Sequence, residues 1–438
     1  MVHQFEDASG YQGEADQVFT PATEPELQSI LQAATRDKIP VTISGARTGL
    51  TGGAVPQGGW LISLEKFQRV EISPGRALAG AGLSLDALQA AASRTGQFYA
   101  PDPTERTASI GGTIATNASG SRSFRYGATR RHILSLRVAF IDGRVVTYNR
   151  GDKVDFNLPQ IPLPKTTKNT AGYLLSPGMD WIDLFTGSEG TLGIVLEAEL
   201  QLLPKPADVL AGVIFLPNDD AVLDAINQWR NLPGLRMLEY FDRNSLTFLR
   251  ERFPEVPERA GAALLIEQEN GDVDFWAENA PADSWFAASD QDRERFRRFR
   301  HALPELVNDT VRRRGFLKLN SDYAVPLDRN REMLAHYHAG LQERSLDYVI
   351  FGHIGDAHVH VNILPSSKEE FETGRRLMLD FARHAVALGG TVSAEHGLGK
   401  RKAHLLEIQY TPDQIESMKA VKRRLDPHWL LNRGNLFP

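Results

Sequence analysis

Three histidines and an amide are concentrated in one short segment of the chain. The segment GHIGDAHVHVN, residues 352–362, contains His353, His358, His360 and Asn362. From His358 onward polar and apolar residues alternate, and on a strand this alternation turns His358, His360 and Asn362 toward one face. His353 reaches that face only across the turn that separates it from His358. Because neutral imidazole is the commonest protein ligand of transition metals, the segment predicts a divalent metal site.

A carboxylate that could complete this site stands in the segment AEHGLGKRK, at Glu395. The chain contains no cysteine, so any metal must use nitrogen and oxygen ligands. Two imidazoles and one carboxylate leave open positions at a metal, which give room for a substrate. The competing interpretation is a histidine-rich surface strand or a set of satisfied core histidines; three histidines within eight residues make it the weaker one.

The composition of the chain limits which kinds of molecule it can bind. The 438 residues suggest two or three domains, and the net charge of -6 argues against a dedicated nucleic-acid binder. The absence of cysteine excludes disulfides, cysteine-ligated iron–sulfur clusters and a cysteinyl link to a cofactor. The polar, acidic N-terminus lacks the features of a signal peptide, and no apolar run is long enough to span a bilayer. We therefore expect a cytoplasmic protein, with peripheral attachment to a membrane left open.

Three glycine-rich segments, residues 44–59, 103–127 and 186–206, separate the elements that must position such a site. The first follows an apolar strand, and its glycines would let backbone N–H groups approach an anion closely, as in a phosphate cradle. It matches neither of the common nucleotide-binding glycine patterns. The small residues of the second segment allow either close approach of a flat ligand or tight backbone packing, and composition alone does not separate the two.

The predicted helices and strands divide the chain into domains. Residues 21–38 predict an amphipathic helix, and the apolar strand that follows gives a β-α-β opening. A proline pair, Pro204 and Pro206, marks a domain boundary. From residue 207 strands alternate with helical patterns, which indicates a split β-α-β sheet. The arginine-rich helix predicted over residues 290–315 is expected to be mainly a solvated face.

Six motifs follow one another along the chain: SGARTGLTGGA, PDPTERTASIGGTIATNASG, TGSEGTLGIV, GHIGDAHVHVN, AEHGLGK and LDPxxLLN. In this order they closely resemble the flavin-dependent D-2-hydroxyacid dehydrogenases. That group includes D-lactate dehydrogenases, D-2-hydroxyglutarate dehydrogenases and the catalytic subunit of glycolate oxidase, all FAD enzymes of the vanillyl-alcohol-oxidase type. The resemblance covers essentially the whole chain.

The resemblance implies an α+β fold in three parts. Residues 1–206 would form an FAD-binding domain of two α+β subdomains. Residues 207–385 would form an α+β cap domain that has an antiparallel sheet and carries the metal site. Residues 386–438 would form a helical segment that returns to complete the flavin site.

The resemblance also assigns FAD contacts to the glycine-rich segments and to the C-terminus. At the C-terminus this chain has Asn432-Arg433-Gly434-Asn435 where the family usually has Asn-Pro-Gly-Lys. The first loop contains neither histidine nor cysteine, so the FAD is expected to be bound non-covalently. The implied contacts are Gly45, Thr48, Gly49, Gly52, Gly53, Pro101, Asp102, Ser109, Gly112, Asn117, Gly120, Glu189, Gly190, Ile194 and Asn432.

For the metal, the resemblance implies His353, His360 and Glu395 as ligands of a zinc, manganese or iron ion. His396 is implied as the base beside the reacting carbon. His358 stands where relatives usually have asparagine, and it is not assigned as a ligand. The implied substrate anchors are Arg300 and Lys318, and Asn362, on the same face as His360, is expected to hydrogen-bond the substrate.

The implied reaction is oxidation of a D-2-hydroxy acid, such as D-lactate, D-2-hydroxyglutarate or glycolate, to the 2-oxo acid. Hydride would pass from C2 to flavin N5, and electrons would leave to an electron-transfer flavoprotein, a quinone, a cytochrome or oxygen. A homodimer is left open. The alternatives are another oxidase of the same flavin superfamily, acting on an alcohol or an ether lipid precursor, a non-catalytic FAD-binding subunit, and a metal-dependent hydrolase. The hydrolase would leave the glycine-rich segments unexplained.

Overall fold

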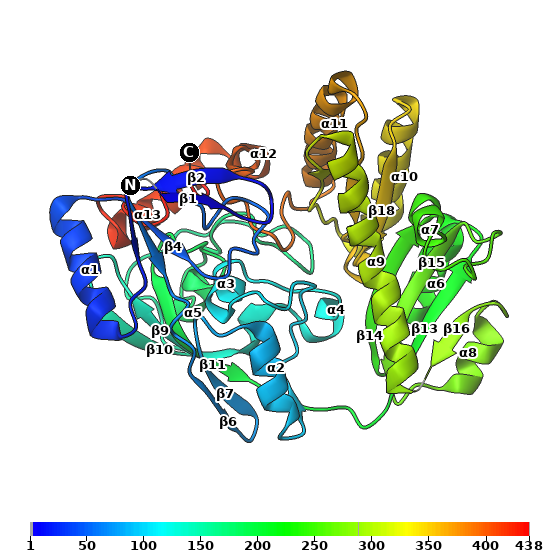
Figure 1. Cartoon of the computed structure of the whole chain (residues 1–438), viewed down its shortest axis with the longest axis horizontal. Helices are drawn as coiled ribbons and strands as arrows, with labels where there is room; N and C mark the ends of the chain where they lie inside the picture. The colour runs from blue at the N-terminus through cyan, green and yellow to red at the C-terminus, as the bar shows by residue number, and fades with distance from the viewer. Residues whose placement is uncertain (1–2, 288, 438) are drawn as a thin grey trace.

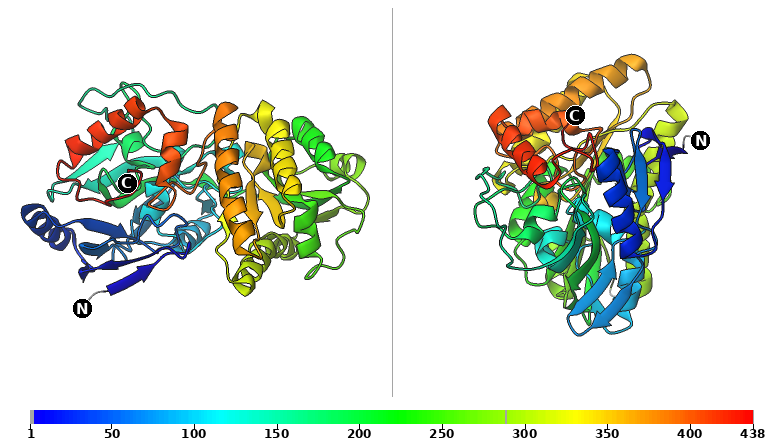
Figure 2. Two further views of the ribbon diagram at one scale, coloured as in Figure 1. Left: turned by 90° about the horizontal axis from the view of Figure 1, so that it is seen from above. Right: turned by 90° about the vertical axis from the view of Figure 1, so that its left-hand side faces the viewer.

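The structure, a computed structural model, describes residues 3–287 and 289–437, which form two parts lying side by side (Figure 1). Residues up to about 204 and the C-terminal segment make up one part. Residues from about 209 to 387 make up the other, as the view from above also shows (Figure 2). The outermost residues of the predicted first and last domains, 1–2 and 438, lie outside the described residues.

The first part is built on two main sheets. A parallel sheet has the order β3-β5-β4, and an antiparallel sheet has the order β10-β9-β11-β7-β6. A hairpin of β1 and β2 and a short pair of β8 and β12 complete it. The strands are β1 (His3–Glu6), β2 (Gln12–Ala15), β3 (Gln17–Phe19), β4 (Val41–Ser44), β5 (Trp60–Ser63), β6 (Val70–Ser73), β7 (Arg76–Gly80), β8 (Gln97–Phe98), β9 (Ile133–Ala139), β10 (Val145–Asn149), β11 (Ile194–Gln201) and β12 (Leu203–Pro204).

Helix α1 (Glu24–Asp37) confirms the helix predicted from the sequence. The Thr23 hydroxyl accepts a hydrogen bond from the backbone of Glu26 and begins the helix, and Leu27 and Leu31 are buried beneath it. Helix α1 leads from β3 to the parallel strand β4, as the β-α-β opening requires. The other helices of this part are α2 (Leu85–Ser93), α3 (Ile110–Ala115), α4 (Ser123–Tyr126), η1 (Thr129–His132) and α5 (Trp181–Phe185).

The second part is built on a seven-stranded antiparallel sheet with the order β16-β13-β15-β14-β18-β19-β17. Every residue of the central strands β13 and β14 is buried, because helices cover both faces of the sheet. The strands are β13 (Val209–Leu216), β14 (Leu235–Asp242), β15 (Ala262–Glu269), β16 (Trp285–Ala287), β17 (Leu319–Asn320), β18 (Tyr348–Gly352) and β19 (His360–Ile363).

The two faces of this sheet belong to different hydrophobic cores. Val213 and Leu265 pack with helices α7 (Arg243–Leu249) and α9 (Asp290–Arg314). Ile214 and Leu264 pack with the helices on the opposite face. The latter helices are α6 (Asp219–Trp229), α8 (Val273–Asn279), α10 (Asn330–Glu343) and α11 (Lys368–Ala387), and short η2 (Leu327–Arg329) and η3 (Ile354–Asp356) connect elements nearby.

The chain then returns to the first part through η4 (Ala403–Leu405), α12 (Leu406–Gln409) and α13 (Pro412–Leu425), drawn in red within that part in Figures 1 and 2. Backbone hydrogen bonds join Val41 of β4 to Leu430 and Asn432, each 2.8 Å long. The predicted α+β fold with an antiparallel cap sheet is confirmed. The strands change sheet between residues 204 and 209, close to the predicted boundary, and the boundary predicted at 385 falls in the last turn of α11. Among the described residues, no helix is both long and apolar enough to cross a membrane.

Candidate active site

A cavity of about 300 Å³ lies where the loop after β4, the start of α3 and the start of β11 meet. At one end it reaches Glu395 and His396, in the loop between α11 and η4. The cavity is lined by many of the residues predicted to contact FAD: Gly45, Thr48, Gly49, Gly53, Ser109, Gly112, Glu189, Gly190, Ile194 and Asn432. The structure therefore brings together segments that are far apart in the sequence.

Five predicted FAD contacts lie beside the cavity without lining it: Gly52, Pro101, Asp102, Asn117 and Gly120. The backbone N–H of Gly52 donates to Asp7 Oδ2, 2.7 Å away, and Asp102 pairs with Arg122 at 3.1 Å. The Asn117 side chain accepts from the backbone of Arg130, and Gly120 donates to Glu395 Oε2 over 3.3 Å. Each of the five lies within two positions of a residue that does line the cavity.

The cavity fits a flat, anionic cofactor. The backbone N–H groups of residues 46–51 donate no hydrogen bond to any residue that the structure describes, so they are free to bind an anion such as a pyrophosphate. A Cβ atom at Gly45 would stand 2.1 Å from Ser109 Oγ, which shows how closely the loop approaches α3. Small side chains dominate the rest of the lining. The free N–H donors and the small lining side chains fit FAD.

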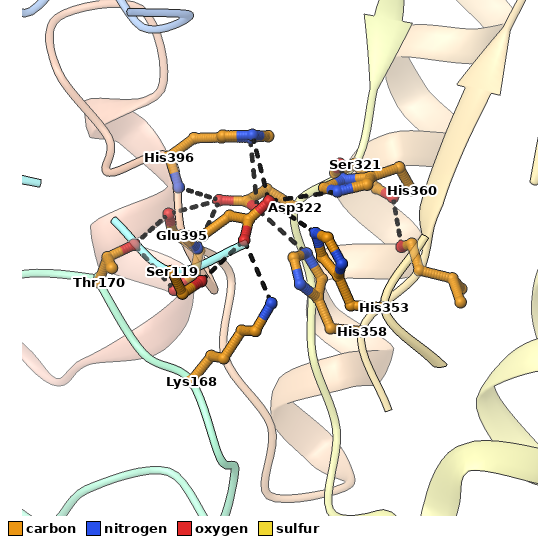
Figure 3. Close-up of polar contacts among 12 residues, drawn as sticks. Ser119, Lys168, Thr170, Ser321, Asp322, His353, His358, His360, Glu395 and His396 are labelled. Atoms are coloured by element: carbon orange, nitrogen blue, oxygen red, sulfur yellow. Dashed lines mark hydrogen bonds and ion pairs between the residues drawn. The ribbon is translucent and has the colours of Figure 1, made fainter. Parts of the chain in front are cut away.

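Beyond the end of this cavity, His353, His360 and Glu395 form what we call the metal-ligand group (Figure 3). Glu395 Oε1 lies 3.1 Å from His353 Nε2 and 3.5 Å from His360 Nε2. The three residues come from the ends of β18 and β19 and from the loop after α11. Two imidazoles and a carboxylate converging in this way suit a divalent transition metal.

Carboxylates and backbone oxygens hold the two imidazoles of this group in place. His353 Nδ1 lies 2.5 Å from Glu239 Oε1, and Arg300 in turn bonds Glu239 Oε2 at 2.8 Å. His360 Nδ1 lies 3.1 Å from the backbone oxygen of Ser321. In both histidines Nε2 is left to face Glu395, an arrangement typical of metal ligands.

Glu395 is also held from the first part of the molecule. Its Oε2 accepts hydrogen bonds from Ser119 Oγ at 2.8 Å and from Lys168 Nζ at 3.2 Å. Lys168 is 1% exposed and lies 3.5 Å from a second buried carboxylate, Asp356. Burial raises the pKa of Glu395, but the charges of His353 and Lys168 outweigh it and hold that pKa well below its usual range. Glu395 is therefore an anion in this site.

His396 lines the flavin cavity, and its ring lies beside Asp322 without a hydrogen bond from Nδ1 to any described residue. Its backbone N–H donates to Asp322 Oδ2 at 2.9 Å, and its Nδ1 lies 3.3 Å from Asp322 Oδ1. Its Nε2 lies 3.7 Å from Glu395 Oε1, on the side of the metal-ligand group. Burial lowers the pKa of His396 to about 4, and the nearby Asp322 only partly offsets this. The imidazole is thus neutral at neutral pH and can accept a proton.

His358 lies against the metal-ligand group. Its ring centroid is 4.6 Å from that of His360 and 5.3 Å from that of His353, and the side chain is completely buried. Its Nε2 is 3.1 Å from Asp322 Oδ1, but the two atoms are not aligned for a hydrogen bond, and neither ring nitrogen has a partner among the described residues. Burial lowers the pKa of His358 to about 3, so its imidazole is neutral.

Glu189, predicted as a flavin contact, also shapes the loop that carries His396. Its carboxylate accepts the backbone N–H groups of Leu398 and Gly399, each at 2.7 Å, and burial raises its pKa to about 7. The Asn432 amide donates to the backbone oxygen of Glu189 at 2.8 Å and accepts from the backbone of Ile43. These bonds tie the C-terminus to the cavity wall.

The three residues predicted to bind the substrate do not line one common cavity. Arg300 lines a second cavity of about 40 Å³ that shares Pro103 and Thr104 with the flavin cavity, and it also bonds Thr104 at 3.0 Å. Lys318 donates to Asn308 and lines neither cavity, and burial lowers its pKa to about 8. The Asn362 amide donates to the backbone oxygen of His360 on its own strand.

Four residues of the site were not predicted from the sequence: Ser119, Lys168, Glu239 and Asp322. Asp322 follows the predicted substrate anchor Lys318 by four residues, so an acidic residue close to that anchor was the available signal. Lys168 and Glu239 lie in segments without any motif. The packing of the two parts brings Lys168 to Glu395, and the pairing of β14 with β18 brings Glu239 to His353.

Fold and site together define a two-part flavin-linked oxidoreductase. Residues 15–149 match the family described as FAD binding domain, and residues 205–436 match the FAD linked oxidases, C-terminal domain. The chain belongs to the FAD-linked oxidase family and is an FAD-dependent oxidoreductase. This membership removes the hydrolase alternative.

Named relatives align along nearly the whole chain. A D-lactate dehydrogenase of Archaeoglobus fulgidus is 31% identical over 96% of this chain and 90% of its own length. The glycolate oxidase subunit GlcD of Bacillus subtilis is 30% identical over 100% and 92%, and a D-2-hydroxyglutarate dehydrogenase of Xanthomonas citri pv. viticola is 30% identical over 95% and 88%. A solved alkyldihydroxyacetonephosphate synthase shares the fold, with a TM-score of 0.68 at 14% identity over 97% of this chain and 76% of that one.

Proposed function

We propose that this protein oxidises a D-2-hydroxy acid to the 2-oxo acid, with non-covalent FAD and a divalent metal. The observation that carries the proposal is the adjacency of Glu395 and His396. Both line the flavin cavity, while Glu395 also belongs to the metal-ligand group. A substrate held at this point would meet a base, a metal and a flavin together.

His396 is the proposed base. With Nδ1 turned toward Asp322, Nε2 is left to take the proton of the substrate hydroxyl. A divalent zinc, manganese or iron ion held by the metal-ligand group would acidify that hydroxyl by Lewis-acid polarisation. FAD, when bound in the cavity, would supply the acceptor for the hydride of C2. The substrate would lose a proton to His396 and a hydride to the flavin, which balances the oxidation to a 2-oxo acid.

We propose that Arg300, Lys318 and Asn362 bind the substrate, with support of different kinds. Arg300 is 15% exposed and lines the small cavity next to the site, which supports a role in attracting a carboxylate. For Lys318 and Asn362 the proposal rests on the resemblance alone. The five predicted flavin contacts behind the cavity wall likewise keep their assignment from the resemblance.

Reoxidation of the flavin needs a separate acceptor: we propose an electron-transfer flavoprotein, a quinone or a cytochrome in the cytoplasm or at the membrane surface. The chain has no cysteine for an iron–sulfur relay of its own. Two relatives named as subunits of glycolate oxidase support an oxidase of several components. We include a homodimer in the proposal, to be tested by a measurement of the oligomeric state.

A dye-reduction screen of D- and L-2-hydroxy acids, with and without a chelator, tests the function on the FAD-loaded protein. We expect at least one D-2-hydroxy acid to reduce the dye, and the chelator to stop it. The variant His396→Ala should retain FAD and lose about 100-fold or more in rate, since a positioned base contributes that much. If no D-2-hydroxy acid is oxidised, or if His396→Ala is fully active, the proposal fails.

A further inference from the structure

We propose that His358 is a fourth protein ligand of the metal, added to the two histidines and the glutamate of the metal-ligand group. The inference rests on the metal site of the proposed function and changes its composition. It concerns an imidazole whose two ring nitrogens make no hydrogen bond to any residue that the structure describes.

His358 lies two residues before His360, the first residue of β19, and the alternation of side chains turns both imidazoles toward the same side, with ring centroids 4.6 Å apart. Its Ala357 neighbour has a φ of 50°, and this turn brings His353 back to the same face. Figure 3 shows His353 and His358 side by side below Asp322.

The distances allow a shared metal. One ligand atom from each of His353, His358, His360 and Glu395 lies within 4.8 Å of those of the other three. Metal–nitrogen bonds of about 2.0–2.1 Å place two ligands of one metal no more than about 4.2 Å apart. The difference between these two distances is roughly half an ångström. Side-chain shifts of that size would bring all four ligand atoms to one ion.

The state of the His358 ring supplies the second, independent observation. Both ring nitrogens are buried, and neither has a hydrogen-bond partner among the described residues. Buried polar groups are nearly always satisfied, so at least one of these two nitrogens calls for a partner beyond the side chains around it. A small rotation that lets one nitrogen donate to Asp322 leaves the other with the lone pair that a metal binds.

A fourth protein ligand would change which metal ions keep a coordination position open for the substrate. Four protein ligands fill a tetrahedral zinc ion, whereas an ion with five or six positions keeps one or two for the substrate. This site would therefore bind zinc tightly but leave substrate positions open only on a metal of higher coordination number.

The test counts imidazoles directly. The FAD-loaded full chain is stripped with a chelator and reloaded with zinc, and X-ray absorption at the zinc edge is recorded for wild type, His358→Asn and the control His336→Asn. His336 is stacked on His384 between α10 and α11, away from the site. Zinc affinity is measured in parallel by competition with a chromophoric chelator.

We expect three imidazole ligands in wild type and in His336→Asn, and two in His358→Asn, with zinc affinity at least about 10-fold weaker in that variant. Two imidazoles in wild type would overturn the inference and leave the proposed function standing, even if His358→Asn does not fold. Unchanged zinc affinity in a folded His358→Asn would also overturn it. A wild-type protein that binds no zinc, manganese or iron would contradict both this inference and the metal-dependent function.

Discussion

Asp322 connects the candidate base to the loop that carries it. Its Oδ2 accepts hydrogen bonds from Ser393 Oγ at 2.8 Å and from the backbone of His396, while Oδ1 faces the His396 ring. The carboxylate is completely buried. Burial raises its pKa, but the imidazoles of His396 and His358 and the charge of Lys402 hold that pKa far below its usual range. The charge of this anion, 3.3 Å from His396 Nδ1, favours the tautomer in which Nδ1 carries the proton.

We therefore predict that Asp322→Asn slows flavin reduction by about 100-fold or more, because the amide can hold the loop but cannot keep His396 in the required tautomer. FAD content should stay unchanged. Single-turnover reduction by the best D-2-hydroxy acid of the screen measures the effect. An unaltered rate constant in the FAD-loaded variant would show that Asp322 does not orient the base.

Lys168 is the buried cation between Glu395 and Asp356. Replacing it by methionine leaves two buried carboxylates without their ammonium partner, so we predict a loss of about 3 kcal/mol in the free energy of unfolding of the metal-free protein. Denaturant unfolding measures this. The exposed Lys165 gives a matched control, Lys165→Met, and an equal loss in both variants would contradict the prediction.

Local sequence predicted part of the site at this scale. The alternation from His358 to Asn362 indicated that His358 and His360 share a face, and their rings do lie together. Lys168, Glu239 and Asp322 could not be predicted in the same way, because their roles arise only when β14, β17 and a loop of the first part converge. The roles assigned to the metal ligands and to His396 remain predictions.

At the scale of elements, one ionic cluster joins the two parts beside the active site. Arg122, at the start of α4, and Arg236 of β14 both bond Glu267 of β15, at 3.0 and 2.8 Å. Burial raises the pKa of Glu267, but the two guanidinium charges outweigh it and lower that pKa to about 2. The cluster ties the cavity wall of the first part to the sheet that carries the histidines.

Glu267→Gln should lower the free energy of unfolding at neutral pH by about 3 kcal/mol, since two buried guanidinium groups lose their shared anion. The folded-state pKa of about 2 lies below the ordinary 4.5, so this stabilisation is present above pH 4.5 and is lost as the pH falls toward 2. Denaturant midpoints across that range should thus converge for variant and wild type. A pH-independent difference, or one matched by the exposed control Glu251→Gln, would contradict this.

At the scale of the whole molecule, the order of motifs predicted the α+β architecture, and the periodicity of residues 21–38 predicted α1. Capping and hydrophobic spacing are local, so a single sequence reveals them. The packing of the two parts is not local. Whether Gly52 and Asn117 face the cavity or its outer wall depends on which segments stand behind them, here Asp7 and Arg130.

Metal, base and flavin are proposed to act at one point between the two parts. Rapid anaerobic mixing of the FAD-loaded protein with a D-2-hydroxy acid, with the flavin absorbance followed through one turnover, tests it most directly. We predict fast bleaching of the metal-reconstituted protein, none with the L-enantiomer of a chiral substrate, and a loss of about 100-fold or more in rate after chelation. Equal rates with and without metal would contradict the claim.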